Sequence, residues 1–160
     1  MSTSYEVFCS AFFDKIQNNK EFFNYYNLTD DESLELAKQR SKGYLKEAIV
    51  KLTLECTPDV NFIDYDDTAE VINVDATIAE IDIVANLMFE MFLQKDIAKL
   101  NAFSPHFTAS ELKSVLSPAN ERNTFLSMYK GVQSDNKDMI DNYKSRDRLT
   151  GKLKTLDFPL

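Results

Sequence analysis

The segment Thr77–Leu100, TIAEIDIVANLMFEMFLQKDIAKL, decides the fold, because it is the one stretch of the chain that is too apolar to lie on a surface. Large apolar residues recur in it every three or four positions, which is the spacing of one helical face. These residues are Ile78, Ile81, Val84, Leu87, Met88, Met91, Phe92 and Ile97. Ile83, Phe89 and Leu93 widen the face beyond half of the circumference. We therefore expect a central helix with other helices packed on more than one side of it.

Local signals place further helices on both sides of this segment. The pairs Thr3–Glu6, Thr29–Glu32 and Thr77–Glu80 have the spacing of a capping box, which begins a helix. The first pair predicts a short helix to Ile16, and the second predicts a long helix that ends near Cys56, because Pro58 disfavours helical geometry in the residue before it.

Two more helices are expected after the central one. Thr108–Leu116 has the signals of a helix of one or two turns, and Ser117 before Pro118 is a strong start signal for a long final helix.

Gly43, inside the second predicted helix, suggests a close neighbour at that position, since glycine costs about 1 kcal/mol against alanine in a helix.

An acidic loop joins the second helix to the central one. Asp59–Asp75 carries six acidic side chains and no basic one, and Val71–Val74 within it predicts a short strand. Asp64, Asp66, Thr68 and Glu70 alternate as calcium ligands do, but Ala69 and Asp75 stand where the calcium loop needs Gly and Glu. We therefore interpret the segment as a solvated loop.

The composition favours one helical domain. The chain has 160 residues, and 44% of them are hydrophobic. It contains only three Gly and four Pro, which are too few for the many turns of a β-sandwich. A formal net charge of −8 disfavours free-standing binding to nucleic acid or to an anionic membrane. The N-terminus has no basic signal-peptide region, and charged residues interrupt the central segment, so we expect neither secretion nor a membrane span.

The residues that usually carry chemistry are sparse and scattered. His106 is the only histidine, and Cys9 and Cys56 are the only cysteines, so no metal cluster or disulfide framework is expected. Cys56 has no basic neighbour in sequence that would activate its thiol. Three dispersed glycines cannot build a phosphate-binding loop. We expect no enzymatic activity and no cofactor.

The C-terminal tail differs in charge from the rest of the chain. Basic residues outnumber acidic ones from Lys144 onwards, and Gly151 and Pro159 interrupt any regular pattern. Such an end is either a frayed terminus or an arm that becomes ordered on a partner.

The sequence thus predicts a mainly α fold. We expect a compact helical bundle around a central apolar helix, with a short strand or hairpin in the acidic loop. Residues 1–145 form the bundle domain, and residues 146–160 form an extended C-terminal arm.

Several strings resemble the head–tail connector, or neck adaptor, proteins of tailed bacteriophages. The strings are YLKEAIVKL at Tyr44–Leu52, DATIAEIDIVANLM at Asp75–Met88, LSPANERNTFLSMYKGV at Leu116–Val132, and the trailing RDRL at Arg146–Leu149. The chain departs from that pattern in a longer insert between Leu52 and Asp75 and in an extra segment, Phe103–Leu112.

The resemblance implies a structural virion protein of the neck, assembled in the host cytoplasm. Such an adaptor forms a ring, by this resemblance a dodecamer, that bridges the portal protein to the next neck or tail-completion protein. DNA passes through the ring without specific binding. The resemblance assigns portal binding to residues of the C-terminal arm: Arg146, Arg148, Leu149, Lys152, Leu153, Lys154, Leu156, Phe158 and Leu160.

A channel for DNA is expected to have a wall that repels the phosphate backbone. The candidate channel-facing acidic residues are Asp59, Asp64, Asp66, Asp67 and Glu70. An alternative function fits the same charge: a small acidic phage inhibitor, or DNA mimic, that acts on a basic host enzyme. That alternative predicts carboxylates over one continuous face and gives the basic tail no role.

Overall fold

The computed structural model of the protein describes residues 2–17, 28–103 and 118–154. Within these residues the chain forms the helices α1 (Tyr5–Ile16), α3 (Asp30–Cys56), α4 (Ile78–Phe103) and α6 (Pro118–Lys144). The fold is mainly helical, as predicted. The predicted helix at Thr108–Leu116 and the residue Ser117 lie outside the described residues, although α6 does begin at Pro118.

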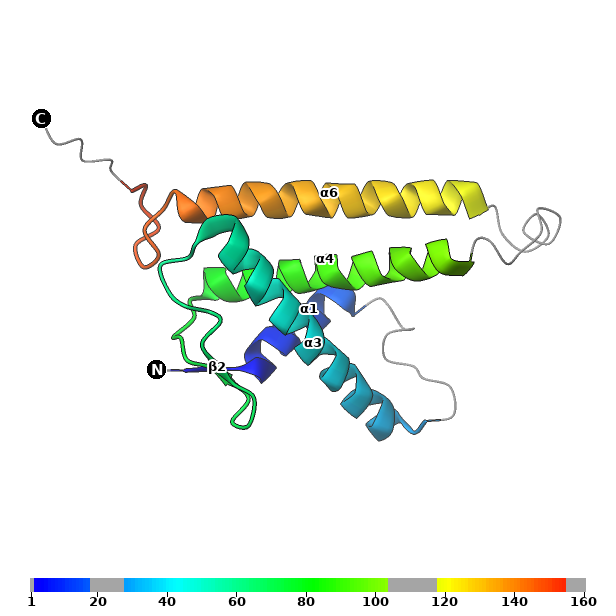
Figure 1. The fold of residues 1–160 in the computed structure, drawn as a ribbon, viewed down its shortest axis with the longest axis horizontal. Coiled ribbons are helices and arrows are strands. Elements are labelled where there is room, and N and C mark those ends of the chain that lie inside the picture. The colour runs from blue at the N-terminus through cyan, green and yellow to red at the C-terminus, as the bar shows by residue number, and fades with distance from the viewer. Residues whose placement is uncertain (1, 18–27, 104–117, 155–160) are drawn as a thin grey trace, which may run out of the picture.

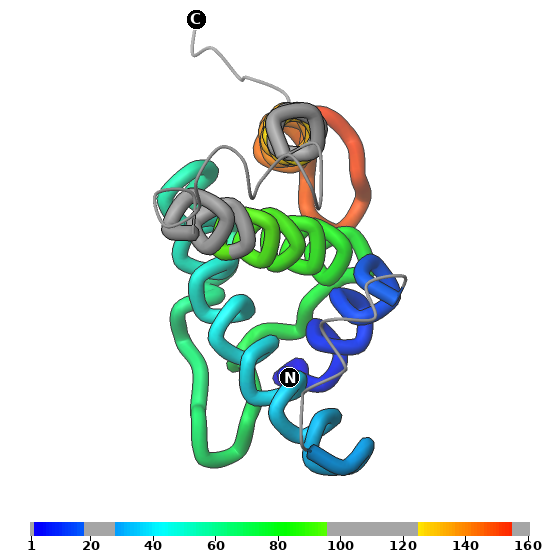
Figure 2. Tube along the Cα trace, turned by 90° about the vertical axis from the view of Figure 1, so that its right-hand side faces the viewer, coloured from blue at the N-terminus to red at the C-terminus, as the bar shows by residue number. Residues whose placement is uncertain are grey.

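Helix α4 is the centre of the bundle, which confirms the main prediction. It packs against α1, α3 and α6, and α6 runs alongside it for most of its length (Figure 1). Seen along the bundle, α6 lies on one side of α4 while α1 and α3 lie on the other (Figure 2). The apolar face of α4 is wide because it must meet helices on both sides.

The core lies between α1, α3 and α4. Phe12, Tyr44 and Phe92, one from each helix, form an aromatic cluster with ring centroids 5.8–6.3 Å apart. The largest fully buried apolar side chains come from these helices and from the loop that follows α3. They are Phe8, Phe12, Leu45, Ile49, Leu52, Phe62, Ile72, Val84, Leu87 and Met88.

A small antiparallel sheet closes one end of the bundle. Its strands β1 (Thr3–Ser4), β2 (Tyr65–Asp66) and β3 (Val71–Ile72) are arranged in the order β1-β3-β2. The predicted strand is therefore present at Val71–Ile72, in a hairpin with β2. The N-terminal segment adds β1 to the other edge, with Thr3 opposite Ile72.

The sheet corrects one predicted helix cap. Thr3 does not cap α1; Ser4 does, its hydroxyl accepting a hydrogen bond from the Glu6 N–H. The Thr3 hydroxyl instead donates to the Val74 carbonyl at 2.7 Å and accepts from the Ala76 N–H at 3.0 Å. Strand pairing places Thr3 beside the start of α4, so its side chain joins the two segments there.

The other two capping boxes are confirmed. The Thr29 N–H donates to the Glu32 carboxylate at 2.9 Å, and the Thr77 N–H donates to the Glu80 carboxylate at 2.8 Å. The predicted close neighbour at Gly43 is wrong, because a Cβ built there meets no atom within 4 Å.

Candidate functional site

The first part of the predicted arm forms a short hairpin, residues 145–154, which we call the C-terminal hairpin. Its ends pair through an antiparallel bridge between Arg146 and Leu153 and through a hydrogen bond of 2.9 Å from the Lys154 N–H to the Ser145 carbonyl. Asp147 holds the turn: its Oδ1 accepts from the Thr150 N–H at 2.8 Å and from the Thr150 hydroxyl at 2.6 Å.

Gly151 makes this turn possible. Its φ is +67°, a left-handed conformation that side chains with a Cβ rarely adopt. The Gly151 N–H donates to the Asp147 carbonyl at 2.9 Å, and the Gly151 carbonyl accepts from the Arg146 guanidinium at 3.0 Å. Local turn chemistry therefore fixes the shape of the hairpin.

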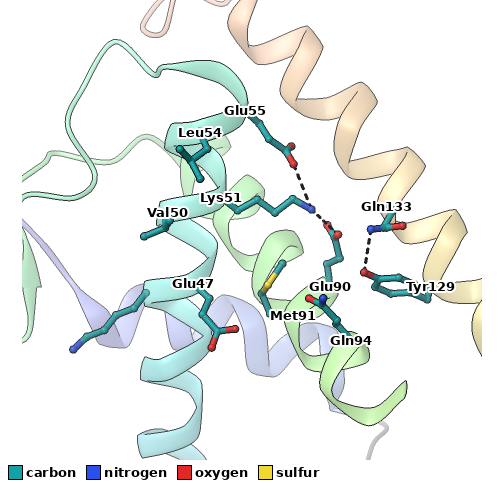
Figure 3. A pocket seen from close by; sticks show the side chains of 11 residues that line it. Glu47, Val50, Lys51, Leu54, Glu55, Glu90, Met91, Gln94, Tyr129 and Gln133 are labelled. Atoms are coloured by element: carbon teal, nitrogen blue, oxygen red, sulfur yellow. Dashed lines mark hydrogen bonds and ion pairs between the residues drawn. The ribbon is translucent and has the colours of Figure 1, made fainter. Parts of the chain in front are cut away.

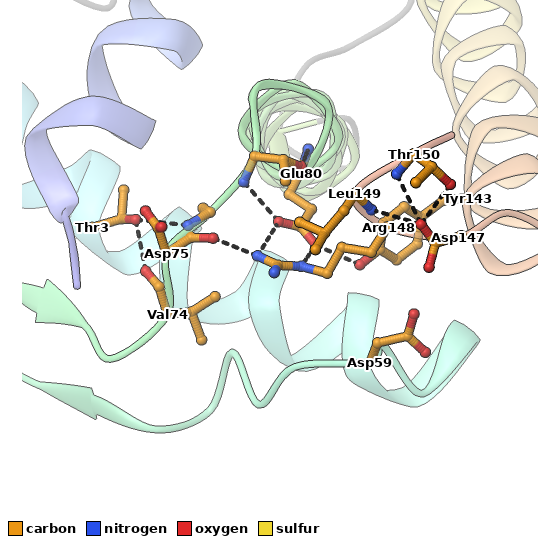
Figure 4. Close-up of polar contacts among 12 residues, drawn as sticks. Thr3, Asp59, Val74, Asp75, Glu80, Tyr143, Asp147, Arg148, Leu149 and Thr150 are labelled. Carbon is orange, nitrogen blue, oxygen red and sulfur yellow. Dashed lines mark hydrogen bonds and ion pairs between the residues drawn. The ribbon is translucent and has the colours of Figure 1, made fainter. Parts of the chain in front are cut away.

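Arg148 anchors the hairpin to the bundle. Its side chain points inward, and the guanidinium meets the carboxylate of Glu80, on the first turn of α4, at 2.6 Å from Nε and 2.9 Å from a terminal nitrogen (Figure 4). The Arg148 guanidinium also donates to the backbone carbonyl of Asp75. The Glu80 side chain is fully buried, so this ion pair is shielded from solvent.

Both carboxylate oxygens of Glu80 accept hydrogen bonds, which stabilises the ionised form. Besides Arg148 and the Thr77 N–H, the Tyr143 hydroxyl at the end of α6 donates to it at 2.6 Å. Burial alone would raise the pKa of Glu80, but the hydrogen bonds from Arg148 and Tyr143 outweigh burial and hold that pKa below its ordinary value. Burial, together with the same carboxylate, raises the pKa of Tyr143.

Anchoring leaves two leucines of the hairpin in solvent. Leu149, at the turn, is 77% exposed, and Leu153, on the returning strand, is 66% exposed. Single exposed apolar side chains are ordinary, as at Leu54 and Ile78, which are 81% and 87% exposed. The two leucines differ in lying together on one short, ordered hairpin, and binding residues are common on such loops.

The structure separates the predicted arm residues into three groups. Arg146 and Arg148 make contacts within the chain, and Lys154 pairs with Asp59 at 3.0 Å. Leu149, Lys152 and Leu153 are exposed on the hairpin. The remaining three, Leu156, Phe158 and Leu160, lie outside the described residues.

The acidic residues predicted to face a channel differ in their contacts: some form ion pairs with lysines, and others do not. Asp67 binds Lys46 at 2.7 Å and the Tyr5 hydroxyl at 3.0 Å, and Glu70 binds Lys42. The hydrogen bond from Lys46 holds the pKa of Asp67 below its ordinary value.

Asp64 and Asp66 make hydrogen bonds within the acidic loop itself. Asp64 accepts from the Asn73 amide at 3.0 Å, and Asp66 accepts from the N–H groups of Thr68 and Ala69. Within the described part of the chain, these two are the members of the acidic set that pair with no cation.

A second buried glutamate lies in an open groove between α3, α4 and α6 (Figure 3). The groove has a volume of about 620 Å³, and its walls include Val50, Leu54 and Tyr129. Glu90, which is 1% exposed, accepts from Lys51 of α3 at 2.5 Å and from Asn136 of α6 at 2.9 Å. We interpret this cluster as a structural tie between three helices, because both oxygens of the buried carboxylate are satisfied.

The pairs Arg148–Glu80 and Lys51–Glu90 were not predicted from the sequence. Their members are 68 and 39 residues apart, and the sequence offers no spacing rule at such distances. A weak signal did exist for both glutamates: each is a charge within the apolar segment Thr77–Leu100, where an ionised side chain needs a partner.

Comparisons with known proteins do not assign this chain to a family. No protein-family model, no curated protein sequence and no solved structure matches this chain. Over the ranges 2–17, 28–103 and 118–154, no helix is long and apolar enough to cross a membrane. The same ranges contain no group of three or more histidine, cysteine, aspartate or glutamate residues placed to hold a metal ion.

Proposed function

We propose that this protein is a structural adaptor of the bacteriophage neck, without enzymatic activity. In this proposal a ring of copies bridges the portal to the next neck or tail component, and DNA leaves the head through the ring. The observation that carries the proposal is the C-terminal hairpin, which Arg148 fastens to the buried Glu80 and which holds Leu149 and Leu153 in solvent.

The hairpin suits a docking role because it is fixed to the bundle and presents two exposed leucines. A peptide that is already ordered loses less conformational entropy when it binds, so a small contact area gives a useful affinity. Leu149 and Leu153 would enter apolar depressions on the portal, while Arg146 and Lys152 would contact acidic residues around them. The partner is thus a surface with apolar pockets and an acidic rim.

The acidic loop that contains β2 and β3 is the candidate wall of the channel. Asp64 and Asp66 are its best candidates, since they are the acidic residues of the set without a paired cation in the described chain. Carboxylates on this wall would repel the DNA backbone and keep DNA from binding there.

The alternative of an acidic inhibitor has less support. A DNA mimic needs an uninterrupted row of carboxylates, whereas Asp59, Asp67 and Glu70 each pair with a lysine of the same chain. The hairpin with its exposed leucines has no role in that alternative.

Two leucine substitutions test the proposal. Leu149→Asp combined with Leu153→Asp should abolish co-elution with the portal protein from the same genome, because charged groups cannot enter apolar pockets. The melting temperature should stay close to that of the unchanged protein, since both side chains are exposed. Leu34→Asp is the matched control, because Leu34 is 42% exposed on the distant first half of α3. Undiminished portal binding by the double variant would contradict the proposal.

A further inference from the structure

Two exposed apolar side chains of α3 border the groove between α3, α4 and α6, which we call the three-helix groove (Figure 3). They are Val50, 43% exposed, and Leu54, 81% exposed. A single exposed leucine is ordinary, but these two lie one helical turn apart and line an open groove. Tyr129 lines the same groove from α6. The three-helix groove therefore offers apolar contacts to another molecule, and we call Val50 and Leu54 the apolar strip.

Two unpaired lysines lie next to this groove. A neighbouring hollow between α3 and α6 shares Lys51, Glu55 and Gln133 with the three-helix groove, so the two are continuous. The α6 wall of that hollow includes Lys130 and Lys137, which are seven residues apart and so lie on one side of the helix. Both are exposed, and neither makes an ion pair with a residue that the structure describes.

The other charged side chains around the groove are mostly paired within the chain. The pairs are Lys46–Asp67, Lys51–Glu90, Lys51–Glu55, Glu47–Lys95 and Lys144–Asp141. The charge that remains for a partner is that of the two unpaired lysines. The groove therefore suits a segment that carries an apolar side chain beside carboxylates.

The first turns of α3 carry such a set of side chains. This end of α3 reaches away from α4 and α6 (Figure 1). Leu34 is 42% exposed there, and Asp30 and Asp31, four and three residues before it, lie on the same side of the helix. Neither aspartate makes an ion pair with a described residue. Carboxylates are common in the first turn of a helix, so it is their combination with Leu34 that is informative.

The two complementary surfaces cannot meet within one chain. Leu34 and Leu54 belong to the same continuous helix, and at about 1.5 Å per residue they lie about 30 Å apart along it. A contact between the first turns of α3 and the three-helix groove must therefore join two copies of the protein.

We propose that the first turns of α3 of one copy dock in the three-helix groove of a second copy. Leu34 packs against the apolar strip, and Asp30 and Asp31 lie next to the two unpaired lysines. Because the two surfaces differ, the contact is head-to-tail and can repeat from copy to copy. This inference deepens the proposed function and rests on it for the closure of the repeated contacts into a ring.

Two single substitutions and their mixture test the contact. Leu34→Asp disrupts the docking turns, and Leu54→Asp disrupts the groove; both side chains are exposed, and circular dichroism checks that both variants fold. Light scattering after size exclusion should give an assembly of several copies for the unchanged protein and a single chain for each variant. An equimolar mixture at high concentration should give a dimer and nothing larger, because one intact helix end and one intact groove remain in it.

The hairpin variant serves as the control. Leu149→Asp with Leu153→Asp should keep the size of the assembly, although it should lose portal binding. Leu34→Asp should still co-elute with the portal, because each copy keeps its own hairpin, so the two proposals can fail separately. An unchanged protein that elutes as a single chain would overturn the contact. So would an assembly that survives either groove-contact substitution, a mixture that stays monomeric, or loss of the assembly in the hairpin variant.

Discussion

Arg148 is the residue on which the position of the C-terminal hairpin depends. Its guanidinium neutralises a fully buried carboxylate, so its removal would leave Glu80 charged and without its main partner. We expect Arg148→Ala to lower the free energy of unfolding by about 3 kcal/mol, as the loss of one member of a buried ion pair does.

Urea-unfolding curves at neutral pH measure this loss. Lys152→Ala is the control: it removes an exposed cation from the same hairpin and should cost less than about 0.5 kcal/mol. Equal losses for the two variants would mean that Arg148 does not anchor the hairpin.

Glu80 makes the stability of the protein depend on pH in a defined direction. Its pKa in the folded protein lies below the ordinary value of 4.5, so the unfolded chain binds its proton more readily. The stabilisation is therefore complete above about pH 4.5 and is lost as the pH falls through the folded pKa.

The variant Glu80→Gln removes this titration. The difference in unfolding free energy between the unchanged protein and Glu80→Gln should be largest near neutral pH and should shrink as the pH falls toward about 3. Urea unfolding at several pH values measures it, and other carboxylates contribute equally to both proteins. A difference that stays constant across this range would contradict the assignment.

At the scale of elements, α4 carries the core. Leu87 is fully buried near the middle of this helix, so Leu87→Ala should cost about 2 to 5 kcal/mol through lost burial and a new cavity. Leu54→Ala removes the same atoms from a side chain that is 81% exposed and should cost less than about 0.5 kcal/mol. Thermal or urea unfolding distinguishes the two, and a small effect at Leu87 would mean that the core is misplaced.

Two glycines should respond in opposite directions to the same substitution. Gly43→Ala, in the interior of α3, adds a methyl group into open space and should stabilise the protein by about 0.5 to 1 kcal/mol. Gly151→Ala meets no neighbour either, but its φ of +67° should make it cost about 1 to 2 kcal/mol. Unfolding free energies of both variants test this, and a stabilised Gly151→Ala would exclude the left-handed turn.

The helices could be predicted because their signals are local. Capping boxes at Thr29 and Thr77, the proline after α3 and the apolar spacing of α4 each act within a few residues. The error at Thr3 has the opposite cause: a pairing with Ile72, 69 residues away, turned an apparent cap residue into part of a strand. Backbone pairing over such a distance leaves no trace in local spacing.

The candidate site could be predicted only in part, for the same reason. The change of charge after Lys144 and the turn residues Asp147 and Gly151 were visible in the sequence. The return of Arg148 to Glu80 was not, because it depends on how α4 and α6 pack. Packing also determines which acidic residues of the loop form ion pairs, because it brings lysines of α3 next to Asp67 and Glu70.

At the scale of the whole molecule, two hairpins of different chemistry lie near the same end of the bundle, where Lys154 pairs with Asp59 at 3.0 Å (Figure 1). The β2–β3 hairpin is acidic, whereas the C-terminal hairpin is basic and carries exposed leucines. In the proposed ring, contacts between copies would be head-to-tail, and such contacts close into a ring when the rotation between copies allows it. The ring and its place in the neck remain proposals.

The most direct test of the adaptor is the mass of the particle in solution. Light scattering after size exclusion should be measured on the protein alone and after mixing with the portal protein from the same genome. The proposal predicts a ring-sized assembly, or co-elution of the protein with the portal. A monomer or dimer that elutes separately from the portal would contradict it.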